Sequence, residues 1–291
     1  MDQGTIEALL DEKLITSKAK LEAFLATSLK LRPASQVTIP AELPGGLNMG
    51  RQIDANVQPQ MIQLGQIQDL RTRAVAVQAI KKLLETNFET IVEGSDEYKA
   101  YYDWSSRLAL RNNQIKVRPT VHELYFYPSK DTGDNIQKLM REREKIRRKV
   151  QRKPGENVNS IRFAYPEEFE PKWLKVLGEI LGYPDCCVQQ YAEDRGHDVN
   201  VETRASQQLL EAVKEKEVDT HAYFTGYFFP CSPRCEKALE KGHEWHDTLK
   251  ELHPKLGELY EQNVYMNTEM VLRQPELISQ YLSQFKPRTS D

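Results

Sequence analysis

The strings GYPDCC at residues 182–187 and FFPCSPRC at residues 228–235 hold all four cysteines of this 291-residue chain. In each string a proline precedes a segment with helical periodicity, and proline is favoured at the first position of a helix. Unpaired backbone N–H groups and the helix dipole at such a start favour a thiolate and lower its pKa. The predicted N-caps are Tyr183 and Ser232, which makes Cys186 and Cys235 the third residues of their helices.

The two helix starts predict a metal site if they face each other. An all-cysteine set is the usual complement of structural zinc or of an iron–sulfur cluster. Successive side chains on a helix diverge by about 100°, which is awkward for two ligands of one ion and easier for a cluster with several metal atoms. The sequence therefore favours an iron–sulfur cluster over zinc, in a redox or modification enzyme, with the ligands Cys186, Cys187, Cys231 and Cys235.

Two other interpretations of the cysteines stay open. Cysteine is among the most buried residue types, and Cys235 begins an apolar stripe that includes Ala238 and Trp245, so the thiols can be ordinary core packing. Alternatively, a thiolate at a helix start is the nucleophile of an enzyme that uses no metal. Disulfides are less expected, because the chain begins with no export signal and thiols stay reduced in the cytosol.

His221 and Arg195 are the candidate catalytic residues. His221 opens the aromatic segment 221–230, where alternation predicts a buried strand that shields the sulfurs from water. The histidine is a base, a further ligand or a hydrogen-bonded core residue. Arg195 and Arg204 supply positive charge to an anionic substrate or cluster, or are solvated helix charges.

The spacing of His243 and His246 permits a separate site with two histidines on one helix face. These residues do not share a metal with Cys235, because a continuous helix places them on the order of 12 and 16 Å from it along the axis. Acidic neighbours in the sequence instead suggest an ordinary polar helix face.

Residues 138–153 carry nine basic side chains against Glu142 and Glu144. A thin apolar stripe lets this helix dock while its positive face suits phosphate groups. The alternative function is therefore an RNA-binding or assembly module with structural cysteines, which contacts RNA or another anionic partner through Arg147, Arg148 and Lys149. Acidic neighbours three or four positions away neutralise part of such a face, and no nucleic-acid motif accompanies it.

The composition and the motif content of the chain exclude several broad classes of protein. With 40 Lys and Arg against 43 Asp and Glu, the chain has no whole-protein charge that draws it to nucleic acid or membrane. No apolar run approaches the roughly 18 residues of a membrane span, so we expect a cytoplasmic protein without a membrane partner. The P-loop, dinucleotide fingerprint, nucleophile elbow and HExxH motifs are absent from the sequence. The substrate and the reaction are therefore not predicted.

Periodicity predicts a mainly α protein with a small β element, an α+β fold whose C-terminal part is helical and holds the cysteines. We expect a helical segment and loop over residues 1–66, a helical region with the basic helix over 67–155, and the cysteine domain over 156–291. Strands are expected at 120–127 and 158–165, joined through the basic helix as a right-handed crossover. The expected helices cover 6–29, 67–84, 98–110, 134–152, 171–182, 184–193, 201–216, 233–252, 256–272 and 275–285, with a loop over 32–66.

Four strings carry a resemblance to a known family: GYPDCC at 182–187, RAS at 204–206, AYF at 222–224 and FFPCSPRCEKAL at 228–239. They resemble an uncharacterised, mainly archaeal family classed as a domain of unknown function, with the motifs GYPxCC and FFPCSPxC. The resemblance covers roughly residues 160–285 and implies that the cysteine region is a portable unit. It implies no activity, fold or cofactor.

Overall fold

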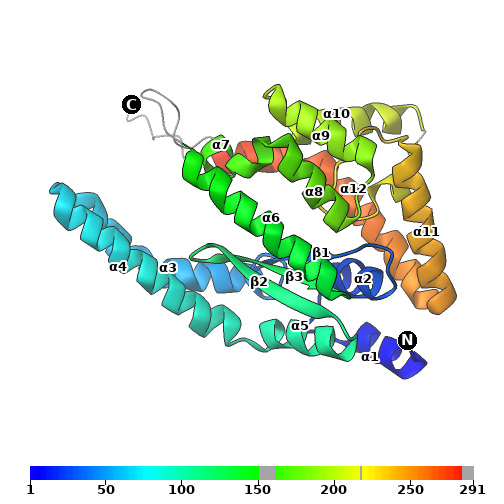
Figure 1. Cartoon of the computed structure of the whole chain (residues 1–291), viewed down its shortest axis with the longest axis horizontal. Helices are drawn as coiled ribbons and strands as arrows, with labels where there is room; N and C mark the ends of the chain where they lie inside the picture. Colours follow the sequence, from blue (N-terminus) through cyan, green and yellow to red (C-terminus); the bar gives the residue numbers. More distant parts are fainter. Residues whose placement is uncertain (151–160, 217, 284–291) are drawn as a thin grey trace. The chain divides into compact units, whose positions relative to one another are not determined.

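The computed structural model describes residues 1–150, 161–216 and 218–283. The chain forms two compact units, an N-terminal unit of residues 1–133 and a C-terminal unit of residues 134–291. Helices dominate the described residues, which also form one small antiparallel sheet (Figure 1). The expected fold class, mainly α with a small β element, is therefore confirmed. None of the helices in the described ranges combines the length and apolar character that crossing a bilayer requires.

The N-terminal unit is built on a three-stranded antiparallel sheet with the strand order β1-β3-β2. Its strands are β1 (Ser35–Ile39), β2 (Arg111–Arg118) and β3 (Val121–Tyr127). β2 and β3 form a hairpin, and β1 pairs with the other side of β3 so that Ser35 lies opposite Phe126. The central strand is buried from Leu124 to Tyr127, where large β-forming side chains follow one another.

Seven helical segments complete this unit within its described residues. They are α1 (Gln3–Asp11), the π-helical segment η1 (Ala19–Leu25), α2 (Ala26–Ser28), α3 (Gly46–Gln66), α4 (Leu70–Phe88), the π-helical segment η2 (Glu89–Glu93) and α5 (Asp96–Arg107). Phe24 joins η1 to the sheet and to α5, because its ring centroid lies 5.0 Å from that of Phe126 and 5.7 Å from that of Tyr101. One aromatic core thus holds the sheet and its helices together.

The predicted loop over 32–66 is wrong, because this stretch contains β1 and the long helix α3. α3 buries only Gly46, Met49, Ile53 and Val57, so most of its sequence is polar and its apolar period is weak. Gly46 fits the tight turn before the helix: a Cβ there would lie 1.9 Å from the carbonyl oxygen of Pro40. β2 was also not predicted, since its sequence is mostly polar on both faces.

The C-terminal unit has helices and connecting loops, and no strand among its described residues. It contains most of α6 (Lys130–Lys149), α7 (Ile161–Ala164), the 3₁₀ segment η3 (Pro166–Phe169), α8 (Pro171–Leu181), α9 (Asp185–Gly196), α10 (Val201–Lys214), the 3₁₀ segment η4 (Thr220–Tyr223), α11 (Glu236–Leu252) and α12 (Pro254–Ser283). α12 packs against α10, α11 and η4, and α8 packs against α9. The residues Tyr223, Phe224, Trp245 and Tyr260 form the fully buried centre of this packing.

Four further predictions for this region are wrong. Residues 161–164 of the predicted strand 158–165 are helical, while 158–160 lie outside the described residues. The crossover is wrong as well, because β3 pairs antiparallel with both β1 and β2. The aromatic segment 221–230 starts with η4 and continues without a strand, and its adjacent residues Tyr223 and Phe224 are both buried. Finally, α12 continues through Pro275 as one helix.

Candidate metal centre

The starts of α9 and α11 lie together and bring the four cysteines into one cluster. α8 ends at Gly182 in the left-handed conformation, with φ 72°, and the amide of Tyr183 donates to the carbonyl of Gly178. Glycine suits this position because it lacks a Cβ. The chain therefore turns sharply between α8 and α9, and the cysteine pair follows directly after the turn.

The predicted helix caps are wrong by one residue at α9 and by three at α11. Pro184 itself is the N-cap of α9, which makes Cys186 and Cys187 the second and third residues of the helix. Cys235 is the N-cap of α11, so Pro233 lies in the preceding turn. The reason at α9 is the extended conformation of Pro184, with φ −60° and ψ 134°, which delays the first helical residue to Asp185.

The four sulfur atoms lie within 4.8 Å of one another. Cys235 Sγ is 3.6 Å from Cys186 Sγ and 3.6 Å from Cys187 Sγ, while the sulfurs of the adjacent pair are 3.9 Å apart. These separations are far longer than the roughly 2.05 Å of a disulfide bond. The predicted convergence of the sulfurs is confirmed, and its geometry is compatible with a metal site.

Burial and hydrogen bonding set the protonation of these thiols. Burial raises the pKa of Cys187 far above its usual range and that of Cys231 to about 11. Burial also acts on Cys235, but the amide of Ala238 and the neighbouring thiols donate to its sulfur and lower its pKa overall. The amide of Cys231 donates to Cys187 Sγ at 3.4 Å. Thiols this close together can all lose their protons only if a cation compensates the negative charges. Metal ligands meet this condition.

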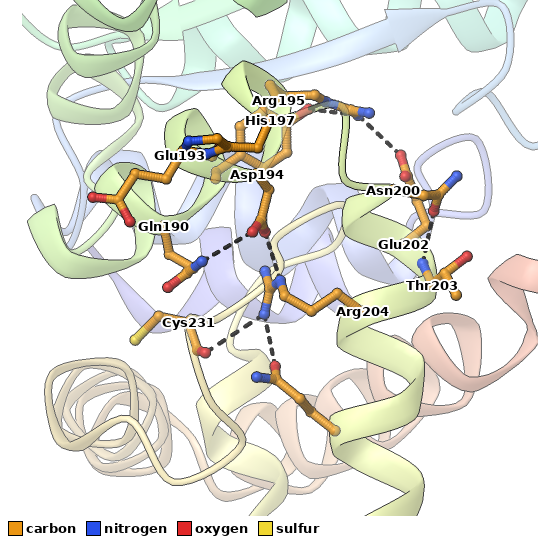
Figure 2. A network of polar contacts seen from close by, with 12 residues as sticks. Gln190, Glu193, Asp194, Arg195, His197, Asn200, Glu202, Thr203, Arg204 and Cys231 are labelled. Atoms are coloured by element: carbon orange, nitrogen blue, oxygen red, sulfur yellow. Dashed lines mark hydrogen bonds and ion pairs between the residues drawn. The ribbon is translucent and has the colours of Figure 1, made fainter.

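A buried ion pair fixes the backbone beside Cys231 (Figure 2). Arg204 on α10 donates through Nε to Asp194 Oδ2 on α9 at 2.5 Å, and its Nη1 lies 3.5 Å from the carbonyl oxygen of Cys231. The side chains of Arg204 and Asp194 are only 14% and 6% exposed. Gln190 also donates to Asp194, at 2.9 Å. Arg204 is therefore a buried residue that positions the cysteine loop, not a solvated helix charge.

The C-terminal unit contains the whole of a region that matches a known family. Residues 134–262 match the model of a family described as "Protein of unknown function (DUF483)". The match covers 129 residues, less than half of the 291-residue chain. It contains all four cysteines, and the expected resemblance to an uncharacterised, mainly archaeal family is confirmed. The family description assigns no activity.

Two archaeal proteins are similar to parts of this chain. An uncharacterised protein of Methanocaldococcus jannaschii is 30% identical over 89 residues, 28% of this chain and 48% of the relative. An uncharacterised protein of Methanothermobacter thermautotrophicus is 31% identical over 65 residues, 22% of this chain and 34% of the relative. Each match therefore spans less than half of the relative's length. No solved structure matches this chain.

Arg195 of the DUF483 segment is part of a second buried polar network. It is 6% exposed, and its guanidinium donates to the hydroxyl of Tyr191 at 2.9 Å and to Glu202 at 3.1 Å. Its third partner, Glu168, lies 3.4 Å away and has a pKa raised by burial. Among the described residues these partners satisfy Arg195 and none of them is a sulfur, so the network ties η3, α9 and α10 together.

His221, the other candidate catalytic residue, lies in η4 and contacts α11. Its Nδ1 is 2.8 Å from Asp219 Oδ1, and its ring stacks on His243 with centroids 4.3 Å apart. His246 approaches the same ring at 5.3 Å. The structure therefore groups His221 with the two histidines that the sequence analysis treated as a separate pair.

The basic helix is only partly available to an anionic partner. Arg147 donates to Glu167 at 3.0 Å, and Arg143 is 3% exposed. Arg148 and Lys149 are exposed, whereas Arg152 and Lys153 lie outside the described residues. The ion pair neutralises one of the three expected contact residues, and RNA binding stays a prediction.

Proposed function

We propose that the DUF483 segment is a metal-binding module in which Cys186, Cys187, Cys231 and Cys235 hold one zinc ion. The observation that carries the proposal is the set of sulfur separations of 3.6, 3.6 and 3.9 Å. A tetrahedral ion with zinc–sulfur bonds of about 2.3 Å places its ligands about 3.8 Å apart. The separations agree with one ion at the centre of the four sulfurs.

These distances support a single ion over the iron–sulfur cluster that the sequence favours. The cysteines of a cubane cluster bind different iron atoms, so their sulfurs lie on the order of 6 Å apart. All separations here are within 4.8 Å, and the adjacent pair, Cys186 and Cys187, converges in spite of its helical divergence. A cluster would require the starts of α9 and α11 to move apart.

The role of this zinc is structural. Four protein ligands close the tetrahedron and leave no position for a substrate, which is typical of structural zinc sites. Cys187 and Cys235 are buried, and the amide of Cys231 supplies a hydrogen bond to one sulfur, as outer contacts commonly do around bound thiolates. The ion then fastens the start of α9 to the turn before α11, in a compartment such as the cytosol that keeps thiols reduced.

Metal analysis of the full chain tests this proposal. Protein purified without oxygen and without chelators is expected to carry about one equivalent of zinc and negligible iron and acid-labile sulfide. Iron together with sulfide would establish the cluster, and iron without sulfide would establish a mononuclear iron site. Less than about 0.2 equivalents of any metal after reconstitution would overturn the four-sulfur site itself.

Single-residue variants connect the metal to this site. Cys187→Ser and Cys235→Ser are each expected to lower the zinc content at least about tenfold under competition with a mild chelator. Ser232→Ala is the matched control, because Ser232 lies in the same turn and, among the described residues, its hydroxyl accepts only from the amide of Arg234. Equal zinc retention in all three variants would contradict the assignment of the ligands.

A further inference from the structure

A second group of potential ligands lies at the contact between η4 and α11. Asp219 Oδ1 is 2.8 Å from His221 Nδ1, and Asp219 Oδ2 is 2.8 Å from His243 Nε2. One carboxylate thus faces two stacked imidazoles, whose planes are 22° apart. The ligand atoms of all three residues lie within 4.8 Å of one another.

The backbone fixes this arrangement. The carboxylate of Asp219 caps η4 by accepting the amide of His221 at 2.9 Å. On α11, Gly242 allows the closest approach: a Cβ there would lie 2.0 Å from the carbonyl oxygen of His221. The two histidines therefore meet because their backbones touch at a glycine, and a larger residue at 242 would separate them.

The group of Asp219, His221 and His243 is buried on the side of His221 and open to solvent on the other side. The side chain of His221 is 18% exposed, whereas those of Asp219 and His243 are 41% and 48% exposed. His221 Nε2 is buried and has no hydrogen-bond partner among the described residues. Nearby, His246 bonds Glu261 at 3.0 Å, which adds negative charge close to the open side. This environment attracts a cation and leaves a solvent path to it.

We propose that Asp219, His221 and His243 bind a divalent transition-metal ion of the zinc class at a second site, separate from the cysteines. Two imidazoles and one carboxylate suit zinc and ferrous iron and leave coordination positions for water or a substrate. In the bound state each imidazole is neutral: the nitrogen that faces Asp219 donates its lone pair to the metal, and the ring's single proton lies on the other nitrogen, which it reaches by exchange through solvent.

The proposal does not rest on the four-cysteine site, because the two sites share no ligand. Cobalt(II) is the probe that separates them. Bound by thiolates, it shows an intense charge-transfer absorption in the near ultraviolet, whereas nitrogen and oxygen ligands give only weak visible bands. Full-length protein whose cysteine site is already loaded with zinc is expected to take up about one further equivalent of cobalt without the thiolate absorption.

Variants locate the second ion. His243→Ala and Asp219→Asn are each expected to weaken cobalt binding by a factor of about 10 to 100 while the cysteine-bound zinc stays in place. His197→Ala is the matched control. His197 is exposed, and among the described residues its ring bonds only the backbone carbonyl of Glu193. Because His243 and Asp219 are half-exposed, their replacement leaves the packing of α11 intact. Absence of the second equivalent at millimolar cobalt, or uptake that His243→Ala leaves unchanged, would overturn the proposal.

Discussion

The two units differ in what holds them together. The N-terminal unit has an aromatic core, in which Phe24 of η1 contacts both Tyr101 of α5 and Phe126 of the sheet. The C-terminal unit also has buried aromatic residues, but it buries two of its four clustered cysteines, Cys187 and Cys235, and charged side chains such as Arg195 and Asp194 as well. Burial of apolar area stabilises a fold without any partner. Buried charges and thiols stabilise it only when their partners are in place.

Because different interactions stabilise the two units, the units should respond differently to the same treatment. Loss of a metal ion removes the link between α9 and the turn before α11, yet it touches no residue of the sheet. Loss of an aromatic side chain in the sheet leaves the cysteine ligands unchanged. The four experiments below test this difference, beginning with the largest expected effect.

Metal removal is expected to open the C-terminal unit alone. Structural zinc contributes roughly 10 kcal/mol or more of apparent binding free energy in small zinc-dependent domains. Chelation under reducing conditions should therefore abolish the protection of amides in α9 and at the start of α11, while β3 stays protected. Hydrogen exchange followed by mass spectrometry measures both regions in one sample. Unchanged exchange in α9 after complete metal removal would mean that the packing, not the ion, holds the helix starts.

Phe126→Ala is expected to destabilise the N-terminal unit and to leave the metal site unchanged. Phe126 is fully buried in the central strand, and replacing a buried phenylalanine with alanine costs about 3 to 5 kcal/mol. We expect faster exchange in β1, β2 and β3, a lower urea midpoint for the N-terminal unit, and an unchanged zinc content. Val75→Ala is the control, since Val75 is 70% exposed and lies in the same unit. A parallel loss of zinc would show that the units depend on each other for stability.

The sequence predicted the parts of this molecule that depend on local periodicity. The helix over 171–182 and the strand over 120–127 carry strong apolar patterns and are present, whereas α3 and β2 are mostly polar and were missed. Their formation depends on neighbours that are distant in the sequence. Gly46 is an example, because its role becomes evident only from its contact with Pro40.

The cysteine cluster was predicted correctly, but its dimensions were not. Whether one ion or a cluster fits depends on how far apart the sulfurs lie. The sulfurs of Cys186 and Cys187 are 3.9 Å apart although successive side chains on a helix diverge. The group at Asp219 was missed because His243 was compared with His246 on its own helix. The available signal was Gly242, a glycine inside a helix directly before a histidine, which indicates close backbone contact with another segment.

A third experiment concerns the buried ion pair beside Cys231. Asp194→Ala leaves the guanidinium of Arg204 without its carboxylate, and an uncompensated buried charge costs roughly 3 kcal/mol or more. The C-terminal unit should unfold at lower urea and release zinc faster to a chelator. The double variant Asp194→Leu with Arg204→Met is expected to recover much of the stability, because it removes both charges. If the double variant were as unstable as the single one, the hydrogen bond from Arg204 to the Cys231 carbonyl would be the more important contact.

The smallest effect is a pH dependence confined to the N-terminal unit. His122 is the only histidine in residues 1–133, and burial lowers its pKa below the usual 6.5 although Glu93 lies 3.6 Å away. Its ring packs on Phe88 with centroids 4.0 Å apart, and its Nδ1 accepts from Gln114 Nε2 at 2.5 Å, which requires the neutral ring. The unfolded chain therefore binds a proton near pH 6.5 that the folded unit does not bind until lower pH.

The sign of this effect follows from the proton count. Stability is complete above about pH 6.5 and falls as the pH drops below that value, because protons then favour the unfolded chain. The urea midpoint of the N-terminal unit, measured by exchange of β3 amides, should be lower at about pH 5.5 than at about pH 8. In His122→Gln the difference should shrink, since glutamine keeps an acceptor near Gln114 and does not titrate. A midpoint that falls equally in both proteins would place the pH dependence in carboxylates instead.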